Sequence, residues 1–225
     1  MLHSYVGMTD VTSTATYSDN TVIQHSGCLV TFARPHKIRM EGKTAPVYPW
    51  DADSGAPFTI ISNGDRTWRS WALDNDGAFR MMVSVEEAID EMAGVTRGAS
   101  QTIPRILLEL PEAHLSAAGS GKPFLESFAD RAEFAACEEL EGQACDCVVS
   151  EQPFGTWTLW IDAETLLLRR LETRKDNAEI RKFTASRKSR IIESVAREAY
   201  EVRPVDVPMD DAVFRPLGWV SASSR

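Results

Sequence analysis

TFARPHKIRME (residues 31–41) is a run of alternating side chains that an Arg-Pro pair interrupts. Proline cannot donate a hydrogen bond to a neighbouring strand, so it marks the edge of a strand or a break in it. Before the interruption, one face of the extended chain carries Cys28, Val30, Phe32 and, at its end, Arg34. The alternation resumes at Ile38 and Met40, which predicts a second strand after a bend.

The same period of two governs most of the chain on both sides of this bend. Two strands are expected before the Arg-Pro pair, and PFTIIS and TWRSWAL flank Asn63-Gly64-Asp65, which is a strong hairpin signal. Strands resume at about residue 131 and continue to 173, and VAREAYEVRPVDV predicts a late strand. Residues 176–194 are compatible with either a basic helix or a long polar hairpin.

The pattern changes at Ser84, where SVEEAIDEM begins with S-x-x-E, the signature of a helix capping box. A helix is expected from here to Gly94 or Gly98, because apolar residues recur on one helical face. That face contains Val85, Ala88, Ile89 and Met92. A second helix is expected over about 100–109, with Ser100 as its cap. Its apolar stripe contains Ile103, Ile106, Leu107 and Leu110.

The order of these elements indicates the fold class. HLSAAGSGKP predicts a loop after the second helix, and strands follow it. Both helices therefore lie between two groups of strands and do not alternate with them. This order favours an antiparallel α+β fold over a parallel, doubly wound sheet.

Composition and charge exclude several classes of protein. The chain has 225 residues, of which 43% are hydrophobic, enough for a substantial core. Its formal net charge of −9 argues against a nucleic acid as the main partner. No run of about 18 apolar residues predicts a membrane-spanning helix. The first residues, MLHSYVGMTD, lack a charged segment followed by an apolar stretch, so they do not resemble a signal peptide.

No catalytic or metal-binding motif emerges. AAGSGKP lacks the spacing of a phosphate-binding loop, and no G-x-S-x-G elbow occurs. The four histidines are scattered and form no H-x-x-x-H pair. We therefore expect a protein that is not an enzyme and that needs no cofactor and no metal.

Three of the four cysteines lie close together, in AEFAACEELEGQACDCVVSE. Glu141-Gly142 predicts a hairpin turn between two short strands. A three-residue loop ending at Gly142 would set Cys137 opposite Cys145, and a change of one residue in the turn would set it opposite Cys147. Either pairing is compatible with a disulfide, and reduced thiols are the alternative. A zinc site is disfavoured because C-x-C lacks the usual ligand spacing.

Four of the six tryptophans form two close pairs, Trp68 with Trp71 and Trp157 with Trp160. A spacing of three residues places the members of a pair on opposite faces of a strand. One member can line a core while the other points outward. A sheet that is apolar on both faces must be covered on both, or must hold a ligand.

The bend and its neighbours resemble the LolA/LolB-like family of periplasmic lipoprotein carriers. TFARPHKIRME is similar to the family's strand that ends in Arg-Pro. Ser62-Asn63-Gly64-Asp65-Arg66-Thr67-Trp68 is similar to its Ser-Asp-Gly, Lys or Arg, Thr, Trp pattern, with Asn in place of Asp. LWIDAETLLLRR (159–170) resembles a strand-turn-strand of predicted outer-membrane lipoprotein-sorting proteins. VFRP (213–216) resembles the family's closing Phe-x-x-Pro-Pro, with Leu217 in place of the second proline.

The resemblance implies a single LolA-like domain over residues 1–225. In it, an antiparallel sheet curls into an unclosed half-barrel, and helices inserted at about 84–110 form a lid. The concave face would hold a lipid or an acyl chain of a lipoprotein during transfer towards the outer membrane. In this family the arginine before the proline bonds the lid and holds it closed, and that residue would be Arg34.

These implications give a set of expected ligand-binding residues and partners. The residues are Val30, Phe32, Arg34, Ile38, Trp68, Ile89, Met92, Ile106, Leu107 and Trp157. We expect a periplasmic monomer, whose signal peptide would precede the sequence given, with a membrane protein as a possible further partner. The alternative is a periplasmic sensor or interaction domain that binds a membrane regulatory protein and transports nothing. A hydrolase with a non-obvious site is a third interpretation.

Overall fold

The computed structural model describes residues 4–45, 55–74, 77–111, 122–152, 155–176, 178, 191–204 and 208–216. Its strands are β1 Ser4–Tyr17, β2 Thr21–Ala33, β3 Lys37–Lys43, β4 Pro57–Asn63, β5 Thr67–Trp71, β6 Arg80–Met82, β7 Ala132–Leu140, β8 Gln143–Gln152, β9 Gly155–Asp162, β10 Leu168–Asp176 and β11 Ile191–Pro204. Its helices are α1 Val85–Ala93, α2 Thr102–Leu107, α3 Phe124–Ala129 and the 3₁₀ helix η3 Asp211–Phe214. None of the described helices is long and apolar enough to cross a membrane.

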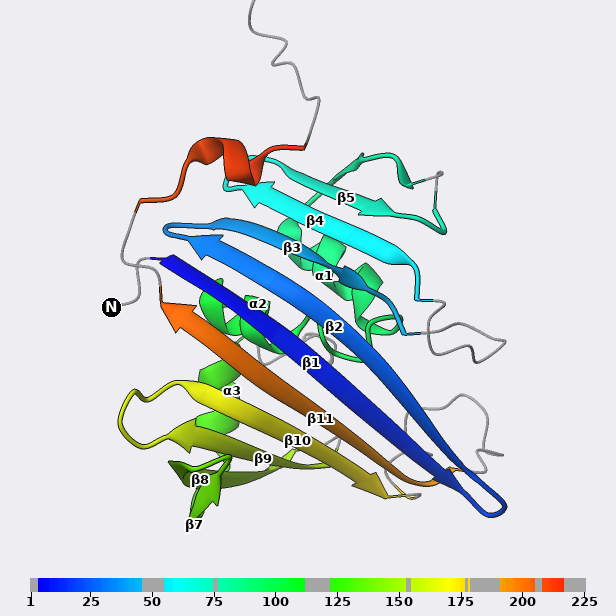
Figure 1. Cartoon of the computed structure of the whole chain (residues 1–225), viewed down its shortest axis with the longest axis vertical. Coiled ribbons are helices and arrows are strands. Elements are labelled where there is room, and N and C mark those ends of the chain that lie inside the picture. Colours follow the sequence, from blue (N-terminus) through cyan, green and yellow to red (C-terminus); the bar gives the residue numbers. More distant parts are fainter. Residues whose placement is uncertain are drawn as a thin grey trace, which may run out of the picture.

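The strands form one antiparallel sheet of 11 strands in the order β6-β5-β4-β3-β2-β1-β11-β10-β9-β8-β7. The first and last strands of the chain pair at its centre, with Thr9 opposite Tyr200. β6 and β7 form the two free edges, so the sheet is unclosed. Figure 1 shows it as a twisted, curved surface with α1, α2 and α3 on one face. The predicted antiparallel, unclosed sheet is confirmed.

The Arg-Pro pair occupies a tight turn between two paired strands. β2 ends at Ala33 and β3 begins at Lys37, and the peptide bond between Arg34 and Pro35 is cis. In the register of this hairpin, Phe32 lies opposite Ile38. Because directly opposed residues point to the same side of a sheet, the two apolar rows before and after the bend form one surface. Its residues Val30, Phe32, Ile38 and Met40 are at most 1% exposed.

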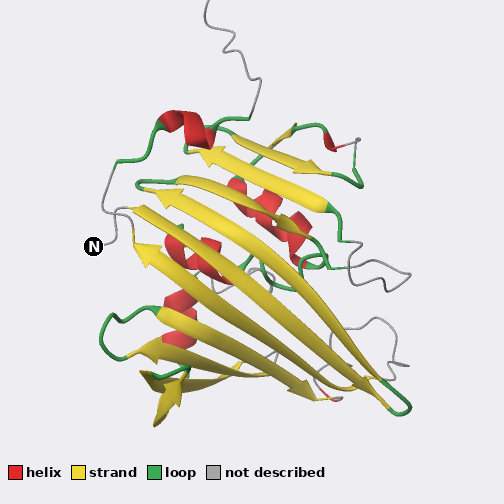
Figure 2. Cartoon of the chain, viewed as in Figure 1, coloured by secondary structure: helices red, strands yellow, loops and turns green. Residues whose placement is uncertain are grey.

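The three α-helices lie in a single layer on this side of the sheet, and Figure 2 shows them in red behind it. α1 begins as predicted, because the Ser84 hydroxyl accepts a hydrogen bond from the Glu87 amide at 3.0 Å. The expected cap of the second helix is wrong. α2 follows Gln101, and Ser100 is instead buried, with its hydroxyl 2.8 Å from that of Thr96.

A third helix, α3, was not expected from the sequence. Its six residues bury Phe124 and Phe128 against the rest of the protein. It contacts α2 and β8, so it extends the helical layer across the second half of the sheet.

The main core lies between the sheet and the helical layer. It joins the Phe32 surface to Ala88, Ile89 and Met92 of α1 and to Ile103 of α2. A smaller core of Ile61, Trp68 and Phe214 lies on the opposite face of the sheet. There η3 covers the strands and places Phe214 at 0% exposure. The Phe32 face is therefore the one that the three α-helices cover.

The cysteine hairpin has a register that the sequence did not predict. Glu141 and Gly142 both have positive φ, of 54° and 82°, and form a two-residue turn between Leu140 and Gln143. Cys137 therefore lies opposite Asp146, and neither expected pairing occurs. All four cysteines are free thiols.

The structure describes only part of residues 176–194, for which the sequence allowed either a basic helix or a long polar hairpin. β10 ends at Asp176 and β11 begins at Ile191. Residues 177 and 179–190 lie outside the described residues, so neither alternative for them is tested.

Candidate functional site

An apolar cavity of about 260 Å³ lies between the helical layer and the second half of the sheet. Its walls come from β1, α2, α3, β9, and the turn and strand that follow β9. All of its lining residues are aliphatic except one tyrosine: Tyr5, Ile103, Ile106, Leu107, Leu125, Leu159, Ile161, Leu166, Leu167 and Leu168. We call this hollow the apolar cavity.

Two sequence patterns bring these side chains together. In α2, residues at positions i, i+3 and i+4 lie on one face, and Ile103, Ile106 and Leu107 have this spacing. In β9, Leu159 and Ile161 alternate and therefore point to the same side. The turn after β9 then brings a run of three leucines back over them, beginning at Leu166 with φ of 58°.

A second hollow of about 260 Å³ lies along β9 and β10, and eight of its fourteen lining residues are polar or charged, so we call it the polar pocket. In this polar pocket Trp157 and Thr173 lie opposite each other in the register of β9 and β10. Two residues further along β9, Leu159 lines the apolar cavity and faces Leu171. The two hollows therefore follow one another along the sheet. The lining of the polar pocket is Ala93, Gly94, Arg97, Gly98, Gln101, Thr102, Arg105, Phe124, Trp157, Thr173, Lys175, Ser194, Ala196 and Glu198.

Glu198 is the one carboxylate among the residues that line the polar pocket. It projects from the centre of the sheet and is 6% exposed. Burial raises its pKa to about 7 and outweighs the opposing effect of hydrogen bonds from Tyr200 and Thr102. The Tyr200 hydroxyl donates to Glu198 Oε2 at 2.6 Å, and burial raises the pKa of Tyr200 well above its usual value. The carboxyl group can therefore gain or lose a proton near neutral pH.

α1 is tied to the sheet by a buried arginine. Arg69 on β5 is 4% exposed, and its Nε lies 2.8 Å from a carboxylate oxygen of Glu91 on α1. The segment after α1 is also held, because the Ser26 hydroxyl donates to the Thr96 carbonyl at 2.5 Å. These contacts fix α1 over the first half of the sheet.

A second buried arginine joins α1 to α2. Arg105 on α2 is 1% exposed, and its guanidinium donates to Asp90 of α1 and to the carbonyl of Pro111. Neither Arg69 nor Arg105 is among the site residues predicted from the sequence. A helical wheel places Arg105 away from the stripe of Ile103, Ile106 and Leu107, which is the usual place for a solvated charge.

Arg34, the expected latch, reaches the helical layer by an exposed ion pair. Its Nη1 lies 4.0 Å from Oε1 of Glu109, which follows α2, and the two side chains are 36% and 72% exposed. The contact joins the bend to the segment that follows α2. Its length and exposure are those of a weak surface pair.

The expected ligand-binding residues divide into those that line a hollow, those packed in the core, Arg34 and Trp68. Ile106 and Leu107 line the apolar cavity, and Trp157 lines the polar pocket. A second group is packed in the core of the same face: Val30, Phe32, Ile38, Ile89 and Met92. Arg34 lies at the turn beyond β2.

Trp68 does not lie where the sequence placed it. It lies on the opposite face, in the small core with Ile61 and Phe214, so it cannot line either hollow. Its partner Trp71 packs against the main core on the helix-covered face instead. The spacing of three residues placed the two rings on opposite faces, but it could not say which face the helices cover.

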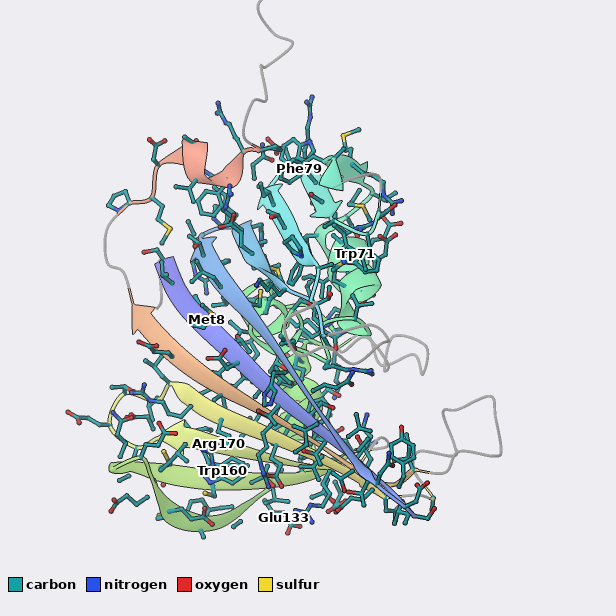
Figure 3. The ribbon with its side chains drawn as sticks, turned by 45° about the vertical axis from the view of Figure 1, so that its right-hand side comes forward. Met8, Trp71, Phe79, Glu133, Trp160 and Arg170 are labelled. Atoms are coloured by element: carbon teal, nitrogen blue, oxygen red, sulfur yellow. The ribbon has the colours of Figure 1, made fainter. Side chains whose placement is uncertain are left out.

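Trp160 points away from both hollows, on the outer face of β9. Its Nε1 donates to Glu138 at 2.9 Å, and the Arg170 guanidinium lies 5.7 Å from the centre of its ring. Figure 3 shows Trp160 and Arg170 next to one another on neighbouring strands. The prediction that one tryptophan of each pair faces a core and the other faces away is confirmed for Trp157 and Trp160.

No family model matches this sequence, and a search of curated proteins finds no match. Solved structures with a similar overall fold include LprF from Mycobacterium bovis, with 12% identity and a TM-score of 0.42 over 89% of this chain and 84% of that one. The lipoprotein LppX from Mycobacterium tuberculosis has 11% identity and a TM-score of 0.38 over 89% and 85%. A LolA superfamily protein from Nitrosomonas europaea has 9% identity and a TM-score of 0.29 over 94% and 90%.

Proposed function

We propose that this protein is a non-enzymatic carrier that binds one acyl chain of a lipid or lipoprotein under its helical layer. The observation that carries the proposal is the apolar cavity, in which every lining residue but Tyr5 is aliphatic. The resemblance of the bend, the Ser62–Trp68 hairpin and the β9–β10 strands to lipoprotein carriers supports the same function. It also supports a periplasmic location.

Such a carrier binds its ligand by removing the acyl chain from water. Each methylene group that moves from water into an apolar cavity contributes roughly 0.8 kcal/mol. Aliphatic side chains and the single tyrosine Tyr5 cannot compensate a charged or strongly polar ligand, so the cavity selects hydrocarbon. Binding needs no bond-making step, and the site requires no nucleophile.

The size of the cavity limits what the closed protein can hold. Its volume of about 260 Å³ lies just below the range of about 300–1,000 Å³ that is typical of small-molecule sites. A single chain is therefore the appropriate ligand of this arrangement. A lipoprotein with several acyl chains would require α2 and α3 to move away from the sheet.

Filling the cavity tests the proposal. Ile106→Phe adds bulk to the wall of the cavity, and Ile23→Phe makes the same change at a position on β2 that is 58% exposed. We expect Ile106→Phe to weaken the binding of a fluorescent fatty acid by about tenfold or more, because excluding two methylenes removes roughly 1.6 kcal/mol. Ile23→Phe should bind as the wild type does.

Native mass spectrometry of the gently purified protein provides a second measurement. A carrier should retain a lipid or a fatty acid whose signal disappears in Ile106→Phe. If the wild type neither retains lipid nor binds the fluorescent fatty acid, the carrier function is wrong.

A second candidate function, an interaction domain that transports nothing, is favoured by one surface feature. Met81 on the edge strand β6 and Phe79 and Val83, which flank this strand, are 66%, 38% and 92% exposed. Figure 3 shows Phe79 at this edge, above Trp71. Such a row suits docking onto another protein. An interaction domain of this kind would leave the fatty acid unbound in the experiment above.

A further inference from the structure

The polar pocket has the properties of a site for a negatively charged group. Three of its lining residues are cations, Arg97, Arg105 and Lys175, and one is a carboxylate, Glu198. The Arg105 guanidinium donates to Asp90 of α1, and Arg97 and Lys175 lie beside it on the lining. The lining of the pocket therefore carries more positive than negative side chains, although the whole chain has a net charge of −9.

The same pocket contains hydrogen-bond donors that lack acceptors. Among the residues that the structure describes, the buried nitrogens of Gln101 (Nε2), Arg105 (Nε) and Trp157 (Nε1) have no hydrogen-bond partner. A buried donor without an acceptor costs about 1–3 kcal/mol, so folded proteins rarely keep one without a reason. All three nitrogens belong to residues that line one pocket, which favours a ligand rich in acceptors for it.

The position of the polar pocket relates this ligand to the apolar cavity. Trp157 lines the pocket and Ile161 lines the cavity, and along a strand four residues span roughly 13 Å. α2 borders both hollows, with Thr102 and Arg105 on one side and Ile103 and Ile106 on the other. Leu171, which is 1% exposed, lies between them on β10.

We propose that the polar pocket binds the anionic head group, a carboxylate or a phosphate, of the amphiphile whose chain enters the apolar cavity. This assignment rests on the proposed carrier function and narrows its substrate class to negatively charged lipids. A shift of α2 and of the Leu171 side chain would join the two hollows into one trough with a polar end. Burial raises the pKa of Glu198 to about 7, so at pH 7 it is about half protonated and opposes the bound anion less than a fully ionised carboxylate would.

Three probes separate the contribution of the head group from that of the chain. Dodecanoate carries the chain and a carboxylate, dodecanol carries the same chain without a charge, and acetate carries the carboxylate alone. We expect the wild type to bind dodecanoate at least about tenfold more tightly than dodecanol, because a charged hydrogen bond is worth about 1.5–3 kcal/mol. Acetate should bind too weakly to measure by calorimetry.

Two double variants that remove the same charge test whether the preference for dodecanoate arises in the polar pocket. Arg97→Gln with Lys175→Gln removes two charges from the pocket, and Lys43→Gln with Arg131→Gln removes two exposed charges elsewhere. Only the first variant should lose the preference for dodecanoate, and both should bind dodecanol as the wild type does. Equal losses in both variants, or tight binding of acetate, would overturn the head-group assignment.

The pH dependence of binding gives a further readout. Glu198 ionises as the pH rises through about 7, whereas the carboxyl group of dodecanoate is already ionised at pH 6. Other groups around Glu198 are Tyr200 and Tyr5 from the sheet and Arg97 and Arg105 from the helical layer. Dodecanoate affinity should therefore fall between pH 6 and pH 8.5 in the wild type and stay level in Glu198→Gln. A fall of equal size in the variant would place the head group elsewhere.

The binding of the three probes tests the head-group site separately from the carrier function. If dodecanol binds and Ile106→Phe weakens it, the apolar cavity holds a chain. Equal affinities for dodecanol and dodecanoate would then reject the head-group site alone. Failure of every chain-bearing probe to bind would reject both.

Discussion

At the scale of single residues, the arginines that hold the helical layer differ greatly in burial. Arg34 at the bend forms an exposed pair with Glu109, whose two atoms are 4.0 Å apart. Arg105 is 1% exposed and bonds both Asp90 and the Pro111 carbonyl. Exposed pairs contribute about 0–1 kcal/mol, whereas a hydrogen bond to a charged group in a buried setting contributes about 1.5–3 kcal/mol. The structure therefore makes Arg105 the stronger tie.

Replacing each arginine by leucine tests this difference. Arg105→Leu should lower the free energy of unfolding by about 2–3 kcal/mol, because it removes the charged hydrogen bonds to Asp90 and Pro111. Arg34→Leu should lower it by less than about 1 kcal/mol. Urea unfolding of the two variants measures both values. A loss in Arg34→Leu as large as that in Arg105→Leu would restore Arg34 as the main latch.

Glu198 makes the stability of the protein depend on pH. Its pKa is about 7 in the folded protein and 4.5 when exposed, so the folded state binds the proton more tightly. The corresponding stability is fully present below pH 4.5 and is lost as the pH rises through 7. At about 1.4 kcal/mol per pKa unit, the loss amounts to roughly 3 kcal/mol.

We expect Glu198→Gln to remove this part of the pH dependence, because glutamine stays neutral and can still accept the Tyr200 hydrogen bond. Urea unfolding between pH 5 and pH 8.5 should show the wild type losing stability relative to the variant. Glu133→Gln, which changes an exposed residue of β7 that Figure 3 labels, is the matched control and should follow the wild type. Parallel curves for wild type and Glu198→Gln would mean that Glu198 titrates normally.

At the scale of elements, the sequence predicted what depends on local pattern. The Asn63-Gly64 signal predicted the hairpin of β4 and β5, and S-x-x-E predicted the start of α1 at Ser84. α3 was missed because six residues are too few for a helical period to stand out from flanking strands. The cysteine hairpin was misaligned because Glu141 adopts a positive φ, which asparagine or glycine usually provides.

The candidate site could be predicted only in part, for a related reason. Alternation sorts residues onto two faces of a strand, and it grouped Val30 with Phe32 and separated Trp157 from Trp160 correctly. It cannot tell which face is covered, so Trp68 was assigned to the wrong side of the sheet. The polar pocket joins residues from α2, β9, β10 and β11, and no spacing in the sequence links these segments.

At the scale of the whole molecule, the helical layer has a fixed part and a part that is held less firmly. α1 has nine residues, a side-chain N-cap and the buried pair of Arg69 with Glu91. α2 and α3 have six residues each, and neither has a side-chain N-cap hydrogen bond. Both border the apolar cavity, through Ile106 and Leu125 respectively. Ligand entry should therefore involve movement of α2 and α3, which breaks the contact of Arg105 with Asp90, while α1 stays on the sheet.

Amide hydrogen exchange tests this division of the helical layer. Short helices with few tertiary contacts open at lower free energy than packed central strands, so the amides of α2 and α3 should exchange first. Those of α1 should exchange more slowly, and those of the central pair β1 and β11 most slowly of all. Dodecanoate should raise protection mainly in α2 and α3, because they must close over the bound chain. If α1 exchanged as fast as α2, or gained most of the protection, the opening would lie over β4 and β5 instead, where α1 contacts the sheet.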